Sequence, residues 1–330
     1  MTTIFRPAAA EDISAIAQFT SKADSGLTTV PKSEISVSDY VTESVAFLAG
    51  KPNANRLLFV VENDGKILGI SGIIPRLGAD RPFYSFKRSR HARKASQQDL
   101  SIRYDTLQLT TDFDDYTELA TIYLAPGARG MGVGRLLSLG RLGFIHTHRE
   151  RFEDRLMADI RGWVNEKGVS PFWKHLGSKF IQIEFDKADR LSSRDAGFII
   201  ELLPSLPILL NLLPKIVGNC AGKPHDLSAG AMNLLMSAGF ENTDLCDIFD
   251  GGPAISCRTD RTVIAQSTFK ATGGGVAESD IKFLHFTGQG EGFQAVLGSA
   301  YPDAKKAGRE ACEALGTETP FVALAQNRRG

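Results

Sequence analysis

The sequence predicts an α+β fold in which a mixed, mostly antiparallel central sheet is flanked by helices, with a small α/β domain appended at the C-terminus. Three observations predict it. Strand-like and helix-like runs alternate along the chain, residues 56–74 have the pattern of a β-hairpin, and a glycine-rich turn joins a strand to an amphipathic helix between residues 117 and 144. The 330 residues favour about two domains, which we place at 1–266 and 267–330.

The first part of the chain supplies antiparallel strands. Residues 3–8 predict a short strand, and residues 10–21 predict a helix with its apolar side chains on one face. Residues 56–74 predict a hairpin because Asp64 and Gly65, between two β-rich runs, tolerate the positive φ angles of a tight turn. Residues 76–105 are polar and basic, which indicates either a long loop or another hairpin.

The second part of the chain continues this alternation. In order, we expect a strand at 117–126, a helix over 133–144, a strand at 155–162, a linker at 270–279 and a helix near 303–314. Residues 170–185 predict a helix that stops at Gly177 and is followed by a strand. Residues 228–250 have the same order of helix, glycine turn and strand, so an internal repeat is a further hypothesis.

The composition argues against several classes of protein. Lysine plus arginine and aspartate plus glutamate both total 38, and no run of like charge suggests a nucleic-acid partner. The cysteines, Cys220, Cys246, Cys257 and Cys312, have no CxxC spacing, so neither a zinc site nor a disulfide framework is expected. This usage favours a reduced, cytoplasmic protein.

The longest apolar run, residues 198–214, is not expected to cross a membrane. Glu201, Pro204 and Pro207 interrupt it, and it is too short to span a bilayer. A buried helix–loop–helix is the first interpretation of the run, and a hydrophobic interface with a partner is the second. The N-terminus has no apolar signal core after a basic start.

The stretch PGARGMGVGRLL, residues 126–137, predicts an anion site. Its three glycines lie where a strand ends and a helix begins, and the first turn of a helix has unpaired N–H groups and a partial positive charge. Glycines remove the side chains that would hold a phosphate away from the backbone, and Arg129 and Arg135 add charged donors. We therefore expect the turn to bind a pyrophosphate.

The spacing of the glycines excludes two common phosphate motifs. Neither GxxxxGK[ST] nor GxGxxG is present. The pattern Arg129-x-x-Gly132-x-Gly134 instead resembles the pyrophosphate motif of the GNAT acyl-CoA N-acyltransferases, and Arg6-Pro7-Ala8 with Asp12 resembles the opening of that superfamily. This resemblance implies a GNAT-type fold for residues 1–266.

Longer blocks resemble a narrower family, the arginine N-succinyltransferases, including the arginine/ornithine succinyltransferase subunits. These blocks are SGLTTVP (25–31), TELATIYLAP (117–126), RGWVNEKGVSPFWKHLG (161–177), FIIELLPSLPI (198–208) and DIFDGGP (247–253). The resemblance implies transfer of the succinyl group of succinyl-CoA to the α-amine of L-arginine, in arginine catabolism. It implies succinyl-CoA as co-substrate without a prosthetic group, no nucleic-acid or membrane partner, and a homo- or hetero-oligomer.

The resemblance also implies positions for the site. Contacts to coenzyme A fall on Ile122, Tyr123, Leu124, Arg129, Gly130, Met131, Gly132, Val133, Gly134 and Arg135. The family's proposed proton donor falls on His225, in KPHDLSAG, where Ser228 replaces a threonine. The preceding residues, NCAGKP (219–224), depart from the family's sequence.

The chemistry of amide formation points to two side chains. Glu118 begins the strand that precedes the glycine turn and is either a general base or a solvated strand-end residue. Trp173 stands where many GNAT proteins have an acidic tyrosine, and an indole cannot take that role. A histidine can donate near neutral pH, which favours His225 as the acid over an exposed or structural role.

The charges of the substrates need complementary side chains. Carboxylates for the guanidinium could come from Asp112, Asp114, Asp115, Asp247 and Asp250, although each could equally be a cap or turn residue. Cations for the succinyl carboxylate could come from Arg161 or from Arg88, Arg90, His91 and Arg93. We expect His146 and His148 to lie at the surface. Two other functions stay open: a GNAT enzyme with another acyl donor or amine, and a non-catalytic subunit.

Overall fold

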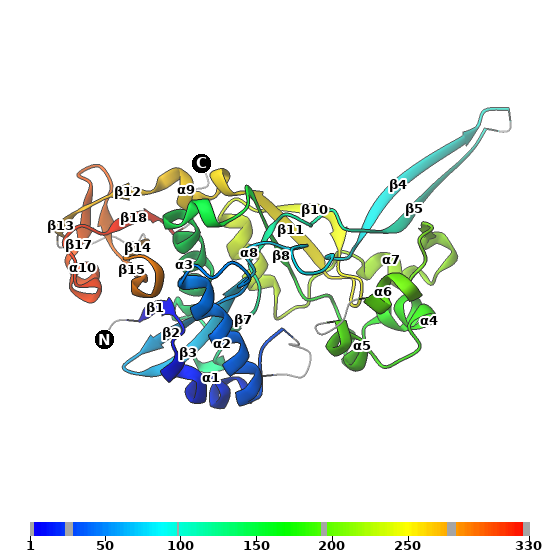
Figure 1. The fold of residues 1–330 in the computed structure, drawn as a ribbon. Helices are drawn as coiled ribbons and strands as arrows, with labels where there is room; N and C mark the ends of the chain where they lie inside the picture. Colours follow the sequence, from blue (N-terminus) through cyan, green and yellow to red (C-terminus); the bar gives the residue numbers. More distant parts are fainter. Residues whose placement is uncertain (1–2, 24–28, 98, 193–196, 276–281, 326–330) are drawn as a thin grey trace.

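In a computed structural model of the protein, the described residues form three β-sheets with helices that cover them (Figure 1). The structure describes residues 3–23, 29–97, 99–192, 197–275 and 282–325. The α-helices are α1 (Ile13–Thr20), α2 (Glu34–Leu48), α3 (Val133–Thr147), α4 (Ser178–Phe180), α5 (Phe185–Ser192), α6 (Gly197–Leu202), α7 (Lys215–Cys220), α8 (Ala229–Ser237), α9 (Val263–Ser267) and α10 (Arg309–Leu315). The α+β prediction is confirmed.

The eight-stranded sheet joins the two ends of the chain. Its order is β12 (Phe269–Lys270), β18 (Phe321–Leu324), β14 (Phe283–Thr287), β15 (Gln294–Gly298), β1 (Ile4–Pro7), β2 (Leu57–Asn63), β3 (Lys66–Ile73) and β7 (Ile122–Leu124). Phe5 of β1 pairs with Ala295 of β15. Strands from either side of residue 266 therefore share one sheet, and the division at that residue stays a prediction.

The seven-stranded sheet carries the middle of the chain. Its order is β6 (Thr117–Glu118), β8 (Arg155–Asp159), β11 (Pro253–Arg258), β10 (Glu241–Cys246), β4 (Ser85–Ala95), β5 (Leu100–Thr110) and β9 (Ile208–Leu209). The hairpin interpretation of the basic segment is correct, and the outer part of β4 and β5 projects away from the body (Figure 1). A three-stranded sheet contains β13 (Thr272–Gly275), β17 (Lys306–Gly308) and β16 (Ala300–Tyr301).

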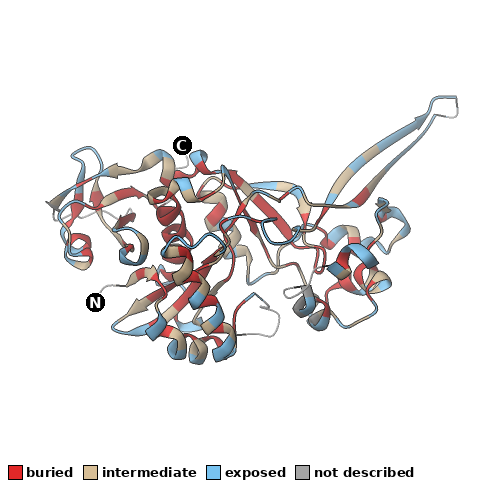
Figure 2. Cartoon of the chain, in the orientation of Figure 1, coloured by how far each residue is buried: buried red, intermediate tan, exposed pale blue. Residues whose placement is uncertain are grey.

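Helix α3 lies at the centre of the largest core cluster. Leu137 and Phe144 are fully buried, and the helix appears in red between the sheets in Figure 2. A Cβ on Gly140 would lie 2.7 Å from the Phe5 ring, so glycine allows the helix to pack directly onto β1. Burial of this apolar face stabilises α3 and fixes where its N-terminus lies.

The predicted turn of the β2–β3 hairpin is confirmed. Asp64 and Gly65 have φ angles of 51° and 75°, as a tight turn requires. The predicted helices at 10–21 and 133–144 are also confirmed. The helix expected near 303–314 exists but begins only at Arg309, because residues 306–308 form β17.

The strand expected after Gly177, within residues 170–185, is wrong. A π-helix, Trp173–Gly177, continues directly into α4, and α5 begins at Phe185. Gly177 does not end the helix: a Cβ there would lie 2.3 Å from the Trp173 ring. The glycine therefore makes room for the indole, which packs against Phe185 and Phe249.

The apolar run 198–214 is not a buried helix–loop–helix. After α6 it forms β9 and the short 3-10 helix Leu210–Leu212, and several of its large side chains face solvent. Leu206 and Leu212 are 75% and 80% exposed. The two prolines prevent one continuous amphipathic helix, so only part of the run reaches the second core cluster.

The linker expected at 270–279 is wrong for its first part, where β12 ends and β13 follows. Residues 276–279 lie outside the described residues, as do residues 25–28 of the first family-like block.

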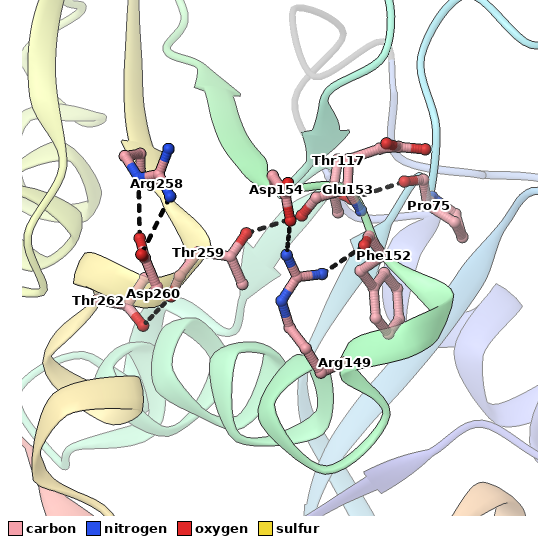
Figure 3. A network of polar contacts seen from close by, with 10 residues as sticks. All are labelled: Pro75, Thr117, Arg149, Phe152, Glu153, Asp154, Arg258, Thr259, Asp260 and Thr262. Atoms are coloured by element: carbon pink, nitrogen blue, oxygen red, sulfur yellow. Dashed lines mark hydrogen bonds and ion pairs between the residues drawn. The ribbon is translucent and has the colours of Figure 1, made fainter.

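A polar network joins the starts of β6 and β8 to the end of the antiparallel strand β11 (Figure 3). The site lies at the opposite ends of these three strands. The Thr117 hydroxyl donates to the Pro75 carbonyl at 2.6 Å and accepts from the Glu153 amide at 3.0 Å. The Thr259 hydroxyl donates to the Glu153 carbonyl at 2.8 Å. Strands β6, β8 and β11 are thereby fixed relative to one another.

Candidate active site

The strand 117–124 is where the two large sheets separate. Its first half, β6, runs parallel to β8, and Glu118 pairs with Met157. Its second half, β7, pairs with β3 in the other sheet. The last pairing with β8 is the bond from the Leu119 amide to the Met157 carbonyl. Beyond this point β7 and β8 belong to different sheets. The backbone after residue 119 is therefore not paired with β8.

A β-bulge marks this separation. The Gly72 amide donates to both the Ala120 and the Thr121 carbonyls, at 3.0 and 2.9 Å. Thr121 has a φ angle of +43°, a conformation that costs energy for a β-branched residue. The Thr121 hydroxyl donates to the Thr29 carbonyl at 3.2 Å. Side-chain and backbone contacts therefore hold the strained turn in place.

Arg141 of α3 supports the bulge from the core. It is 1% exposed, and its Nη1 donates to the carbonyls of Gly72 and Ala120 at 3.2 and 3.0 Å. Its Nε donates to the Leu137 carbonyl. Burial lowers the pKa of this guanidinium to about 10, while the nearby Glu118 raises it. Sequence reasoning missed Arg141, although an arginine inside an apolar helical stripe was a signal.

The glycine turn lies at the far end of β7. Gly130 and Gly132 have φ angles of 81° and 84°, and Gly132 is the N-cap residue of α3. Gly130, Met131 and Gly132 are exposed. A Cβ on Gly134 would lie 3.7 Å from Leu124, so the start of α3 packs on β7. The turn thus presents an accessible helix N-terminus.

The other residues expected to contact coenzyme A surround this turn. Ile122, Tyr123 and Leu124 form β7 and are half-buried. Val133 is buried as the first residue of α3, whereas Arg129 is exposed and Arg135 is half-buried. The ten predicted residues therefore form one continuous edge that runs from the bulge to the helix N-terminus.

Glu118 is buried and is not a solvated strand-end residue. It is 8% exposed, and burial raises the pKa of its carboxyl to about 7. The positive charges of Arg141 and Arg56 oppose this shift. A carboxyl group with a pKa near neutrality is suited to accept a proton at physiological pH.

Further carboxyl groups lie at the end of β8. Asp159 ends that strand opposite Ala254 of β11. Asp250, in the loop between β10 and β11, accepts from the amides of Gly162 and Gly252 at 2.7 and 2.8 Å. Asp247 accepts from two amides of the same loop at 2.7 Å each. Burial and the neighbouring carboxylates raise the pKa of Asp159, and they raise that of Asp247 to about 8.

His225 lies beside the same strand end. Its amide donates to the Arg161 carbonyl at 2.8 Å, and its Nδ1 accepts from the Leu227 amide at 3.1 Å. The segment after it enters α8 at Ser228, the N-cap residue. Leu234 of α8 lies 4.0 Å from a Cβ placed on Gly134. A short segment thus leads from His225 to the glycine turn.

Several side chains expected to bind the charged groups of the substrates instead contact other residues of the protein. Lys87 binds Asp112 at 2.7 Å, and Arg76 binds Asp115 at 2.6 Å, both near the surface. Asp114 accepts from the Phe83 amide. Arg88 binds Asp105 and the carbonyls of residues 218 and 221.

The remaining candidates for the succinyl carboxylate fall into two places. Arg90, His91 and Arg93 lie along the projecting hairpin (Figure 1). His91 is bonded there to the Thr106 hydroxyl at 3.0 Å. Arg161 lies two residues beyond Asp159, the last residue of β8.

The surface position expected for His148 is wrong. It is 6% exposed and stacks on Phe144, with 4.1 Å between the ring centroids. Its Nε2 accepts from the Gly290 amide at 2.9 Å, so a turn from the C-terminal part of the chain covers it. The neighbouring His146 is half-buried, and burial lowers its pKa.

Two wider features concern the part of the chain that the structure describes. No helix in it is both long enough and apolar enough to cross a bilayer. No cluster of three or more histidine, cysteine, aspartate or glutamate residues in it is arranged to hold a metal ion.

Comparison with known proteins gives consistent matches. The family model described as "Arginine N-succinyltransferase beta subunit" matches residues 3–264. The arginine N-succinyltransferase of Escherichia coli is 33% identical over 263 residues, which cover 78% of this chain and 76% of that protein. The structure of the arginine/ornithine succinyltransferase subunit AI from Pseudomonas aeruginosa superposes with a TM-score of 0.85 and 27% identity, and covers 99% of both chains.

Proposed function

This chain belongs to the arginine N-succinyltransferase family, and we propose that it transfers the succinyl group of succinyl-CoA to the α-amine of L-arginine. The observation that carries the proposal is the separated strand, with an exposed glycine turn at one end and buried carboxyl groups at the other. A GNAT-type fold for residues 1–266, coenzyme A contacts along β7 and the turn, and roles for Glu118 and His225 are parts of the same proposal.

Coenzyme A lies along the edge from the turn to the bulge. Its pyrophosphate is held by the amides between Gly130 and Arg135, with the Arg129 and Arg135 guanidinium groups as charged donors. Its pantetheine arm pairs with Ile122–Leu124 as an added strand would. The thioester then reaches the bulge, where backbone N–H groups polarise its carbonyl.

Amide formation needs one base and one acid. The Glu118 carboxylate takes a proton from the α-ammonium, and the amine nitrogen attacks the thioester carbon. The nitrogen of the tetrahedral intermediate then gives its second proton to solvent, the carbon–sulfur bond breaks, and His225 protonates the leaving thiolate. Arg161, next to His225, supplies the positive charge for the succinyl carboxylate.

The proposal predicts a specific pattern of thiol release. The pure protein should release free thiol from succinyl-CoA with L-arginine, and the same assay with ornithine and lysine identifies the preferred amine. Release from acetyl-CoA and not from succinyl-CoA would instead indicate another GNAT activity. If calorimetry shows no binding of coenzyme A, the chain is a non-catalytic subunit.

Replacement of His225 by alanine should lower kcat by roughly 10²–10⁴-fold, because the thiolate loses its proton donor. The affinity for coenzyme A should persist, since the glycine turn is unchanged. His146→Ala, in the last turn of α3 and so at the opposite end of that helix from the glycine turn, is the matched control and should retain kcat. An unchanged kcat in His225→Ala would remove this side chain from the mechanism.

A further inference from the structure

Three carboxyl groups, those of Glu118, Asp159 and Asp247, lie together at the separation of the sheets. Glu118 pairs with Met157 in a parallel register, so Glu118, Met157 and Asp159 present their side chains on one face of the sheet. Asp159 is partly exposed as a residue, yet its Oδ1 atom is sealed from solvent and has no hydrogen-bond partner. Within the described ranges, Glu118, Asp159 and Asp247 form no ion pair closer than 4.0 Å.

The cations nearby do not neutralise this group. Arg141 directs its guanidinium to the carbonyls of Gly72, Ala120 and Leu137. Desolvated carboxylates without a partner are costly, and they normally bind a proton or a cation. The ionisable groups that act on one or more of these three carboxyl groups are Glu118, Asp247, Asp250, Arg56 and Arg141. Burial, and after it the charge of these carboxyl groups, raises the pKa values of Cys246 and Tyr40.

We propose that Asp159, together with Asp247, is the binding site for the α-ammonium of the amine substrate and holds it beside Glu118. The proposal rests on the proposed function, because it places the ammonium where the thioester reaches the bulge. Asp159 ends β8 just beyond the last hydrogen bond between the two strands, so an ammonium that enters where the strands separate can supply the donor that its Oδ1 lacks. Glu118, on the same face, is then placed to take the proton.

The unliganded site holds protons that the ammonium must displace. The pKa of Asp159 is raised by burial and by the carboxylates of Asp247, Glu118 and Asp250. A bound ammonium favours the ionised carboxylates and lowers these pKa values. Binding of the amine should therefore release about one proton near pH 7 and should tighten as the pH rises from 6 to 8.

Calorimetry of the intact protein, saturated with coenzyme A, tests this linkage. L-Arginine is titrated at pH 7 in buffers with different ionisation enthalpies, which gives the number of protons released. Nα-acetyl-L-arginine keeps the guanidinium but lacks the ammonium, so any binding of it should release no proton. Arginine binding without proton release would overturn the inference. Equal release with the acetylated compound would assign the carboxylates to the guanidinium and would also overturn it.

The matched variants are Asp159→Asn and Asp260→Asn. Asp159→Asn removes the charge and keeps the shape, and it should weaken arginine binding by roughly 30-fold or more and abolish the proton release. Asp260 is exposed and paired with Arg258, so the Asp260→Asn variant should bind arginine with the affinity and proton release of the native protein. Native affinity in Asp159→Asn contradicts the inference.

The outcomes separate this inference from the proposed function. Proton-linked arginine binding without thiol release from succinyl-CoA would support the ammonium site and contradict the succinyltransferase activity. Thiol release with arginine, together with native arginine affinity in Asp159→Asn, would support the succinyltransferase activity and contradict the ammonium site. If Asp159→Asn does not fold, the inference is still tested by comparing the protons that the native protein releases on binding L-arginine and Nα-acetyl-L-arginine.

Discussion

Replacement of Gly132 by valine should abolish coenzyme A binding while the protein stays folded. Gly132 has a φ angle of +84°, in which a β-branched residue is strongly disfavoured. A Cβ there would also stand in the exposed mouth of the turn, 3.5 Å from Leu297 on its inner side. The side chain would keep a phosphate from the first amides of α3, and the strained backbone would turn those amides away.

The cost to folding should be smaller than the cost to binding. Backbone strain of this kind is worth about 1–3 kcal/mol, which is less than the stability of an ordinary domain. Calorimetry should show the Kd for coenzyme A raised at least ~100-fold, because most phosphate contacts are lost. Gly127→Ala is the control: a Cβ at that exposed glycine meets nothing within 4 Å, so binding should be native. Native affinity in Gly132→Val would rule out the turn as the phosphate site.

Local signals in the sequence predicted the local parts of this site. The glycine turn, the helix after it and the β2–β3 hairpin each follow from a few neighbouring residues, and the structure has all three. The bulge at Thr121 could not be predicted in this way. It depends on Gly72, which comes from another hairpin and bonds to two successive carbonyls.

Long-range packing explains the other errors. Gly177 has the sequence context of a helix stop, but its role is to admit the Trp173 ring. His148 lies among polar residues in the sequence, yet the turn at Gly290 covers it. Asp159 follows an apolar strand and has the appearance of an ordinary strand end. Only the fold brings it beside Glu118 and Asp247.

Replacement of Arg141 by methionine should both destabilise the protein and shift its pH–rate profile. Methionine keeps much of the apolar volume but removes the Arg141 donors to the carbonyls of Gly72, Ala120 and Leu137. The Ala120 carbonyl still accepts from the Gly72 amide and the Leu137 carbonyl from the Ser71 hydroxyl, so the main cost falls on the Gly72 carbonyl. A buried polar group left unsatisfied costs about 1–3 kcal/mol, so we expect a loss of that size in the free energy of unfolding. Denaturant unfolding measures this loss.

The effect on activity has a defined sign. The Arg141 charge holds down the pKa of Glu118, which burial raises to about 7. Without that charge Glu118 stays protonated to higher pH, and a protonated carboxyl cannot accept the ammonium proton. The acidic limb of kcat/KM should therefore move to higher pH, with the rate reduced at pH 7 and partly recovered at pH 9.

The control separates the charge effect from a general loss of stability. Arg258 is exposed and paired with Asp260, so Arg258→Met should change the free energy of unfolding by less than about 0.5 kcal/mol and leave the profile in place. A destabilised Arg141→Met with an unshifted acidic limb would mean that Glu118 is not the base. Arg141 would then act only by holding the bulge, and the proton would have to leave through another of the carboxyl groups that face the separated strand.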